Sequence, residues 1–143
     1  MQQEDWFMGQ INLLGRVLGK ILADLLGLKA RGKVGEGIET AEKALISELD
    51  LNIDELISIP VQRFIKTLQE QKNFNNEDLE KLSDIFFLIA EEYGQRGIEG
   101  AKKKKLFKRS LIVYEYLDKT GSTYSLDRHT KIEIIKSLVH NIK

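Results

Sequence analysis

The densest group of charged side chains in this sequence is a cluster of cations in its second half. Six of them fall within eight residues, with no acid among them: Lys102, Lys103, Lys104, Lys105, Lys108 and Arg109. Such a cluster can hold the phosphates of nucleic acid or anionic lipid, or bind an acidic segment of another protein. Each cation in the first turn of a helix costs about 0.3 to 1 kcal/mol of stability, because it interacts unfavourably with the helix dipole. A binding role for the cluster would offset this cost. The alternative is a solvated helix face, neutralised by the acids Glu91, Glu92 and Glu99.

A second group of polar residues lies on one face of the last predicted helix. It consists of His129, Glu133, Lys136 and His140. A histidine and a carboxylate four residues apart can begin a metal site, but no cysteine and no third histidine exist to complete one. The opposite face carries Ile134, Ile135, Leu138 and Val139. The polar residues therefore lie on the face that we expect to be exposed to solvent, and we expect no metal site there.

Catalytic motifs are not recognisable. No arrangement of serine, histidine and acid has support in the sequence, and no glycine-rich phosphate loop follows a strand. Scattered acids such as Glu91, Glu92 and Glu115 do not define a pair. We therefore expect no enzyme and no cofactor.

The composition indicates the class of element that must position these residues. The chain has 143 residues, 42% apolar and 31% charged, with one proline and 8% aromatic residues, which favours an all-helical protein over a sandwich or barrel. We expect a single domain over residues 1–143. The net charge is zero, so any attraction to an anionic partner must be local. The absence of cysteine and of a positively charged leader predicts a cytoplasmic protein.

Hydrophobic periodicity predicts six or seven helices. They cover residues 4–28, 35–48, 53–71, 76–93 and 98–118, with a last helix from 126 nearly to 143. Pro60 should divide 53–71 into two pieces, because proline disfavours helical geometry in the residue before it. Asn75 or Asn76 and Ser125 are predicted N-caps. Residues 11–28 are mostly apolar, but Arg16, Lys20 and Asp24 interrupt them as in an amphipathic helix rather than a membrane span.

The first helix has an unusually wide apolar stripe. Its predicted core face consists of Phe7, Ile11, Leu14, Leu18, Ile21, Leu22 and Leu25. Its glycines Gly9, Gly15 and Gly19 favour close approach of another helix or subunit. Trp6 and Phe7 are either core anchors or part of a patch that recruits a partner. One alternative for the whole protein is therefore a homodimer through the first helix.

A turn that occurs twice suggests a helical repeat. Ala30-Arg31-Gly32 and Gln95-Arg96-Gly97 each end one apolar helix and begin another. The residues around them resemble tetratricopeptide repeats, in which large, small and aromatic residues recur at fixed spacing: Phe86, Ile89, Ala90 and Tyr93 before the second turn, and Ile38, Ala41, Ala44 and Leu45 after the first. Asp24, Leu25 and Lys102 depart from the pattern, and a regular array would not contain residues 53–71.

The tetratricopeptide resemblance implies antiparallel helical hairpins packed as a right-handed array, with a groove that binds peptide or helix segments. The opening Asp5-Trp6-Phe7-Met8 also resembles a set of small uncharacterised bacterial proteins, which implies no known activity. We therefore expect a non-enzymatic protein–protein interaction module or adaptor. Binding of nucleic acid or anionic lipid through the basic cluster is the main alternative.

Overall fold

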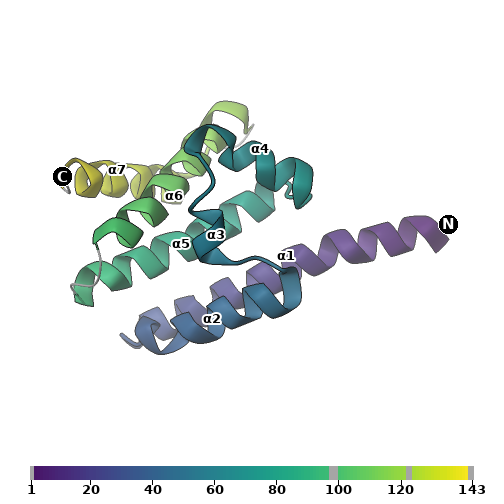
Figure 1. Ribbon diagram of the computed structural model, residues 1–143, viewed down its shortest axis with the longest axis horizontal. Coiled ribbons are helices and arrows are strands. Elements are labelled where there is room, and N and C mark those ends of the chain that lie inside the picture. Colours follow the sequence, from purple (N-terminus) through teal and green to yellow (C-terminus); the bar gives the residue numbers. More distant parts are fainter. Residues whose placement is uncertain (1, 97–99, 122–123, 142–143) are drawn as a thin grey trace.

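The protein is all-helical in its computed structural model (Figure 1). The structure describes residues 2–96, 100–121 and 124–141, with side chains for 13–94, 100–121 and 124–139. Over these ranges it contains seven helices and no strand, which confirms the predicted fold class. The helices are α1 (Gln2–Ala30), α2 (Val34–Leu49), α3 (Ile53–Leu56), α4 (Val61–Gln71), α5 (Asn76–Arg96), α6 (Gly100–Thr120) and α7 (Leu126–Asn141).

The predicted break at Pro60 is confirmed. The short helix α3 begins at Asn52, whose side chain accepts a hydrogen bond from the Glu55 backbone N–H at 3.0 Å. Pro60 is the N-cap residue of α4. Since proline cannot donate a backbone hydrogen bond and fixes its own φ, it suits a helix start and not a helix interior.

Two further helix starts are confirmed by their hydrogen bonds. At α5, the Asp78 backbone N–H donates to Asn75 Oδ1 at 2.8 Å, and the Asn75 N–H donates to Asp78 Oδ2 at 3.1 Å. At α7, the Arg128 N–H donates to Ser125 Oγ at 3.1 Å. Side-chain oxygens thus satisfy donors that have no partner within the helix.

Of the two repeated turns, the structure describes only the first in full. Gly32 adopts φ +69°, a left-handed conformation that glycine adopts without a steric penalty, and the Lys33 N–H donates to the Leu28 carbonyl. Gly97 of the second turn lies outside the described residues.

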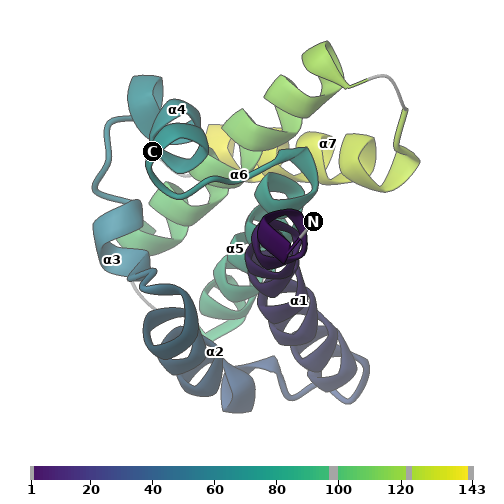
Figure 2. The same ribbon diagram turned by 90° about the vertical axis from the view of Figure 1, so that its right-hand side faces the viewer.

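Helix α5 occupies the centre of the molecule, between the α1–α2 hairpin and the pair α6–α7 (Figures 1 and 2). Six consecutive residues of α5, from 85 to 90, are buried, so this helix is covered on all sides. Helix α1 runs beside it in the same direction, with Gly15 next to Asp78 and the Lys29 ammonium 3.4 Å from the Glu91 carboxylate. The centre of the core is therefore a run of apolar residues in one helix.

The core face of α1 follows the predicted stripe where it is described. Leu18, Ile21 and Leu25 are buried, and Leu14 and Leu22 are partly buried. The side chains of Trp6, Phe7 and Ile11, and those around Gly9, lie outside the described residues. No helix in the described part of the chain is long and apolar enough to cross a membrane.

Gly15 and Gly19, predicted to allow close helix approach, leave room for a methyl group at ordinary contact distance from side chains of α5. A Cβ at Gly15 would lie 3.4 Å from Asp78 Oδ1, and one at Gly19 would lie 3.8 Å from Lys81 Nζ. The tightest helix–helix contact is at Gly37 of α2, which the sequence analysis missed. A Cβ there would lie 2.3 Å from Leu28 Cδ1. Gly37 therefore allows α2 to pack closely against α1.

Candidate binding surface on helix α6

The six predicted cations lie on α6, but the structure divides them between two roles. Lys102 faces the rest of the protein. Its ammonium lies 3.2 Å from Asp54 Oδ1 and 3.7 Å from Glu42 Oε1, and 5.5 Å from the centre of the Tyr93 ring. Burial lowers the pKa of Lys102, but Glu42, Tyr93 and Asp54 together outweigh it, and the net shift is upward. Lys102 thus connects α6 to α2 and α3.

Arg109 is also used inside the fold, because its side chain is buried, with the residue only 8% exposed. Its Nη2 donates to the Ile59 carbonyl at 2.8 Å, and burial lowers the pKa of the guanidinium. Ile59 precedes Pro60, so this bond holds the irregular segment between α3 and α4 against α6. Arg109 Nε is buried and has no hydrogen-bond partner among the described residues.

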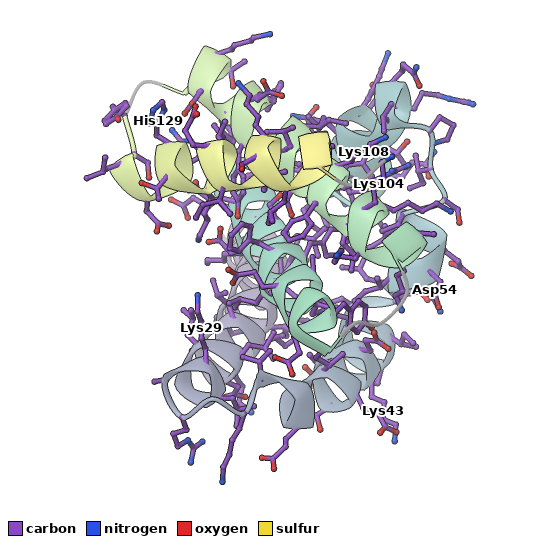
Figure 3. The ribbon with its side chains drawn as sticks, turned by 90° about the vertical axis from the view of Figure 1, so that its left-hand side faces the viewer. Lys29, Lys43, Asp54, Lys104, Lys108 and His129 are labelled. Carbon is purple, nitrogen blue, oxygen red and sulfur yellow. The ribbon has the colours of Figure 1, made fainter. Side chains whose placement is uncertain are left out.

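The other four cations are Lys103, Lys104, Lys105 and Lys108, and we call them the lysine surface. Lys104 and Lys108, labelled in Figure 3, are one turn apart on α6. Lys105 between them is exposed, and the stem of Lys103 packs on Gly94. No acid among the described residues forms an ion pair with these four lysines. The cluster is therefore smaller than predicted.

The acids that the sequence analysis named for neutralising the cluster are Glu91, Glu92 and Glu99. Glu91 pairs with Lys29 of α1 instead. Glu99 lies outside the described residues. The acids that do neutralise a cation of the cluster are Glu42 and Asp54, at Lys102, and they come from distant parts of the sequence.

The one aromatic residue inside the cluster is unavailable for base stacking. Phe107 is 1% exposed and packs edge-on against Phe87 of α5, with ring centres 5.8 Å apart. Proteins that hold single-stranded nucleic acid combine cations with accessible aromatic rings. The lysine surface has the cations alone.

A polar network that sequence reasoning missed attaches α7 to α5 and α6. The hydroxyl of Tyr114, a fully buried residue, donates to Asp84 Oδ1 at 2.5 Å, and the Lys131 ammonium lies 3.0 Å from the same oxygen. Burial raises the pKa of the Asp84 carboxyl. Burial and the neighbouring Asp84 charge raise the pKa of Tyr114, so its hydroxyl stays protonated.

Arg128 forms the second half of this network. Its Nε donates to Asp118 Oδ1 at 2.7 Å and its Nη1 to Glu80 Oε2 at 2.9 Å. One guanidinium of α7 therefore contacts carboxylates of both α5 and α6. Sequence reasoning had no signal for this arrangement, because Glu80 lies 48 residues before Arg128 in the chain.

The polar face of α7 is described in the structure except for one side chain. His129 and Glu133 are exposed, Lys136 pairs with Glu115 at 3.9 Å, and the His140 side chain lies outside the described residues. No group of acids and histidines that could hold a metal occurs among the described side chains. Of the four residues predicted for the opposite face, Ile135 is fully buried and Val139 is partly buried, but Ile134 and Leu138 are more than one third exposed.

Two hollows lie along the α1–α2 hairpin. The first, of about 630 Å³, runs between the two helices over Val17, Ile21, Ala41 and Ala44. The second, of about 1090 Å³, lies where α1, the end of α2 and the segment before α5 meet. Neither hollow includes a residue of the lysine surface.

Comparisons with protein-family models, with curated proteins and with solved structures found no match. The function must therefore be inferred from the arrangement of the side chains.

Proposed function

We propose that this protein is a non-enzymatic interaction module that binds an acidic segment of a partner protein through the lysine surface. The observation that carries the proposal is the separation of the cations of α6 into two groups. Lys102 and Arg109 have acceptors inside the fold, whereas Lys103, Lys104, Lys105 and Lys108 have no acidic partner among the described residues. Closely spaced lysines repel one another, and an acidic partner relieves this repulsion.

One observation favours an acidic protein segment over nucleic acid. Phe107, the aromatic residue of the cluster, is buried. A tetratricopeptide-like groove and a cytoplasmic location are part of the same proposal, and they rest on the sequence resemblance and the sequence pattern described above.

The test is a charge reversal confined to three residues of the lysine surface. We expect Lys104→Glu/Lys105→Glu/Lys108→Glu to abolish capture of an acidic partner from nuclease-treated lysate and binding of a fluorescent glutamate-rich peptide. The matched control is Lys43→Glu/Lys66→Glu/Lys119→Glu, which reverses three exposed lysines elsewhere and should leave binding intact. Lys102 and Arg109 are left unchanged, because their loss would disturb folding.

Salt dependence separates the alternative partner classes. Binding to nucleic acid through several phosphates loses orders of magnitude in affinity between about 50 and 200 mM salt. Tight binding of an oligonucleotide or of anionic vesicles with that salt dependence, combined with no binding of the acidic peptide, would contradict the proposal. Equal peptide binding by the two triple variants would do so as well.

A further inference from the structure

The smaller of the two hollows is a groove between α1 and α2, and we call it the hairpin groove. All of its lining residues belong to α1, α2 and the turn between them. The buried side chains of Val17, Ile21 and Ala41 form part of its floor. Helix α5 packs against the same hairpin (Figure 2) but contributes no lining residue. The hairpin groove is therefore closed by no other helix of the described part of the chain.

The hairpin groove has the length of a short helix. Its lining residues run from Val17 to Arg31 on one side, which is about 21 Å, and from Glu36 to Glu48 on the other, about 18 Å. A Cβ added at Gly27, which also lines the groove, would meet no atom within 4 Å. Small-molecule sites enclose most of their ligand, and an open groove of this length does not. A helix of about twelve to fourteen residues matches the length.

The two edges of the hairpin groove carry a pattern of charges. The α1 edge has the cations Lys20 and Arg31, eleven residues apart, with Asp24 between them. The α2 edge has the acids Glu36 and Glu48, twelve residues apart. None of these five side chains forms an ion pair with another described residue. Each end of the groove therefore presents a cation on one edge and an acid on the other, both without an ion-pair partner among the described residues.

We propose that the hairpin groove binds a helix of a partner protein that carries an apolar stripe, acids along one edge and bases along the other. The apolar stripe lies on the floor of the groove, as in other helix-in-groove complexes. Acids of the partner helix face Lys20 and Arg31. Its bases face Glu36 and Glu48. Eleven residues are close to three helical turns, so side chains at that spacing stand in line on one side of a helix.

The mixed charges of the edges argue against other classes of partner. Nucleic acid and anionic membranes present phosphates only, and the acids Asp24, Glu36 and Glu48 repel phosphates. A helix with charges of one sign meets repulsion at one of the two edges, whereas a helix with both signs meets attraction at both. The hairpin groove shares no residue with the lysine surface, so this site goes beyond the proposed function.

Three helix-stabilised peptides of about sixteen residues test the charge pattern. They share one apolar stripe and differ only at their edges. The mixed peptide has glutamates on one edge and lysines on the other, the acidic peptide has glutamates on both edges, and the basic peptide has lysines on both. By fluorescence anisotropy we expect the mixed peptide to bind about tenfold more tightly than either of the others, because exposed ion pairs contribute up to about 1 kcal/mol each. Equal binding of the three would overturn the proposal.

The double variant Glu36→Lys/Glu48→Lys should reverse this preference. It makes the α2 edge basic, so the acidic peptide should bind about tenfold more tightly than the mixed peptide. Glu36 lies in the first turn of α2 and Glu48 in the last. The two lysines therefore lose one favourable interaction with the helix dipole and gain another, and stability should change little. A variant that keeps the preference of the wild type would contradict the proposed contacts.

A second variant, Gly27→Trp, blocks the hairpin groove without changing its charge. The tryptophan has room to enter the groove, because no atom lies within 4 Å of an added Cβ. We expect the mixed peptide to bind at least about tenfold more weakly, a loss of about 1.4 kcal/mol, with helical content unchanged by circular dichroism. The control Leu26→Trp changes an exposed neighbour that does not line the groove, and it should bind as the wild type does.

Three outcomes of these measurements would overturn the proposal. The first is no binding of the mixed peptide to the wild type at about 1 mM. The second is equal binding by Gly27→Trp and Leu26→Trp. The third is a wild-type dimer in light scattering that Gly27→Trp dissociates, because it would assign the groove to a second copy of this chain. The variant Lys104→Glu/Lys105→Glu/Lys108→Glu should bind the mixed peptide as the wild type does, and loss of binding there would show that the two surfaces are one site.

Discussion

Lys108 and Arg109 are adjacent and carry the same charge, yet the structure gives them opposite surroundings. Successive residues of a helix are about 100° apart, so a run of cations cannot all face the same side. Arg109 turns inward to the Ile59 carbonyl, whereas Lys108 is half-buried and belongs to the lysine surface. The run of cations could be read from the sequence. Its division into two groups could not, because it depends on the α3–α4 segment, which lies about 50 residues earlier in the chain.

At the same scale, we expect Tyr114→Phe to lower the free energy of unfolding by about 1 to 3 kcal/mol. The change removes a buried donor and leaves Asp84 without its bond from the Tyr114 hydroxyl. The control Tyr124→Phe alters a tyrosine that is mostly exposed, and should change stability by less than about 0.5 kcal/mol. Urea denaturation measures both, and equal losses would contradict the role given to the Tyr114 hydroxyl.

Asp84 should make a pH-dependent contribution to stability. Its pKa in the folded protein is raised above 3.8 by burial, so the folded state holds the proton more tightly than the unfolded state. The contribution of Asp84 is therefore full below about pH 3.8 and is lost as the pH rises through the raised pKa. Asp84→Asn removes this titration while retaining an oxygen that can accept from Tyr114.

The measurement for Asp84 is urea denaturation of wild type and Asp84→Asn between acidic and neutral pH. The free energy of unfolding of the wild type minus that of the variant should fall as the pH rises. A difference that grows with pH would mean that the charge of Lys131 outweighs burial at this carboxyl.

At the scale of elements, the sequence predicted those helix ends and turns that depend on residues close together in the chain. The break at Pro60, the caps at Asn75 and Ser125, and the turn at Gly32 each involve residues within a few positions, and all are confirmed. The attachment of α7 could not be predicted, because Arg128 meets Glu80 across 48 residues. Periodicity placed Ile134 and Leu138 on the buried face, whereas Ile132 and Ile135 are the core residues of this helix.

Two glycines of the α1 region should respond in opposite directions to alanine. At Gly32, with φ +69°, Gly32→Ala should lower stability by about 1 kcal/mol, because a side chain disfavours the left-handed conformation. At Gly27, inside α1 with no atom within 4 Å of an added Cβ, Gly27→Ala should raise stability by up to about 1 kcal/mol. Thermal or urea unfolding measures both, and the same sign at the two positions would contradict the backbone argument.

At the scale of the whole molecule, α5 joins two differently constructed halves. The α1–α2 hairpin packs on it through apolar residues such as Leu18, Ile21 and Leu45. Helix α7 contributes the buried Ile132 and Ile135 and is also held by the ion pairs of Arg128 and Lys131. A run of six apolar residues such as 85–90 is typical of a helix that is covered on all sides. This run therefore indicated the central helix, although helical periodicity alone did not reveal it.

We therefore expect Arg128→Met to loosen α7 selectively. The change removes contacts to two helices, and the partner carboxylates are partly exposed, so the loss should be about 1 to 3 kcal/mol. Hydrogen exchange should accelerate over Leu126–Asn141 and stay unchanged over Val34–Leu49. Uniform acceleration in both helices would show that the two halves unfold together.

The contrast between the two halves also has a thermal consequence. Apolar contacts weaken on cooling, whereas ion pairs become less costly to desolvate on heating and are screened by added salt. Cooling should therefore loosen the end of the molecule formed by α1 and α2 first, and concentrated salt the end formed by α7. The end that unfolds locally first is then determined by temperature and salt concentration as well as by the sequence.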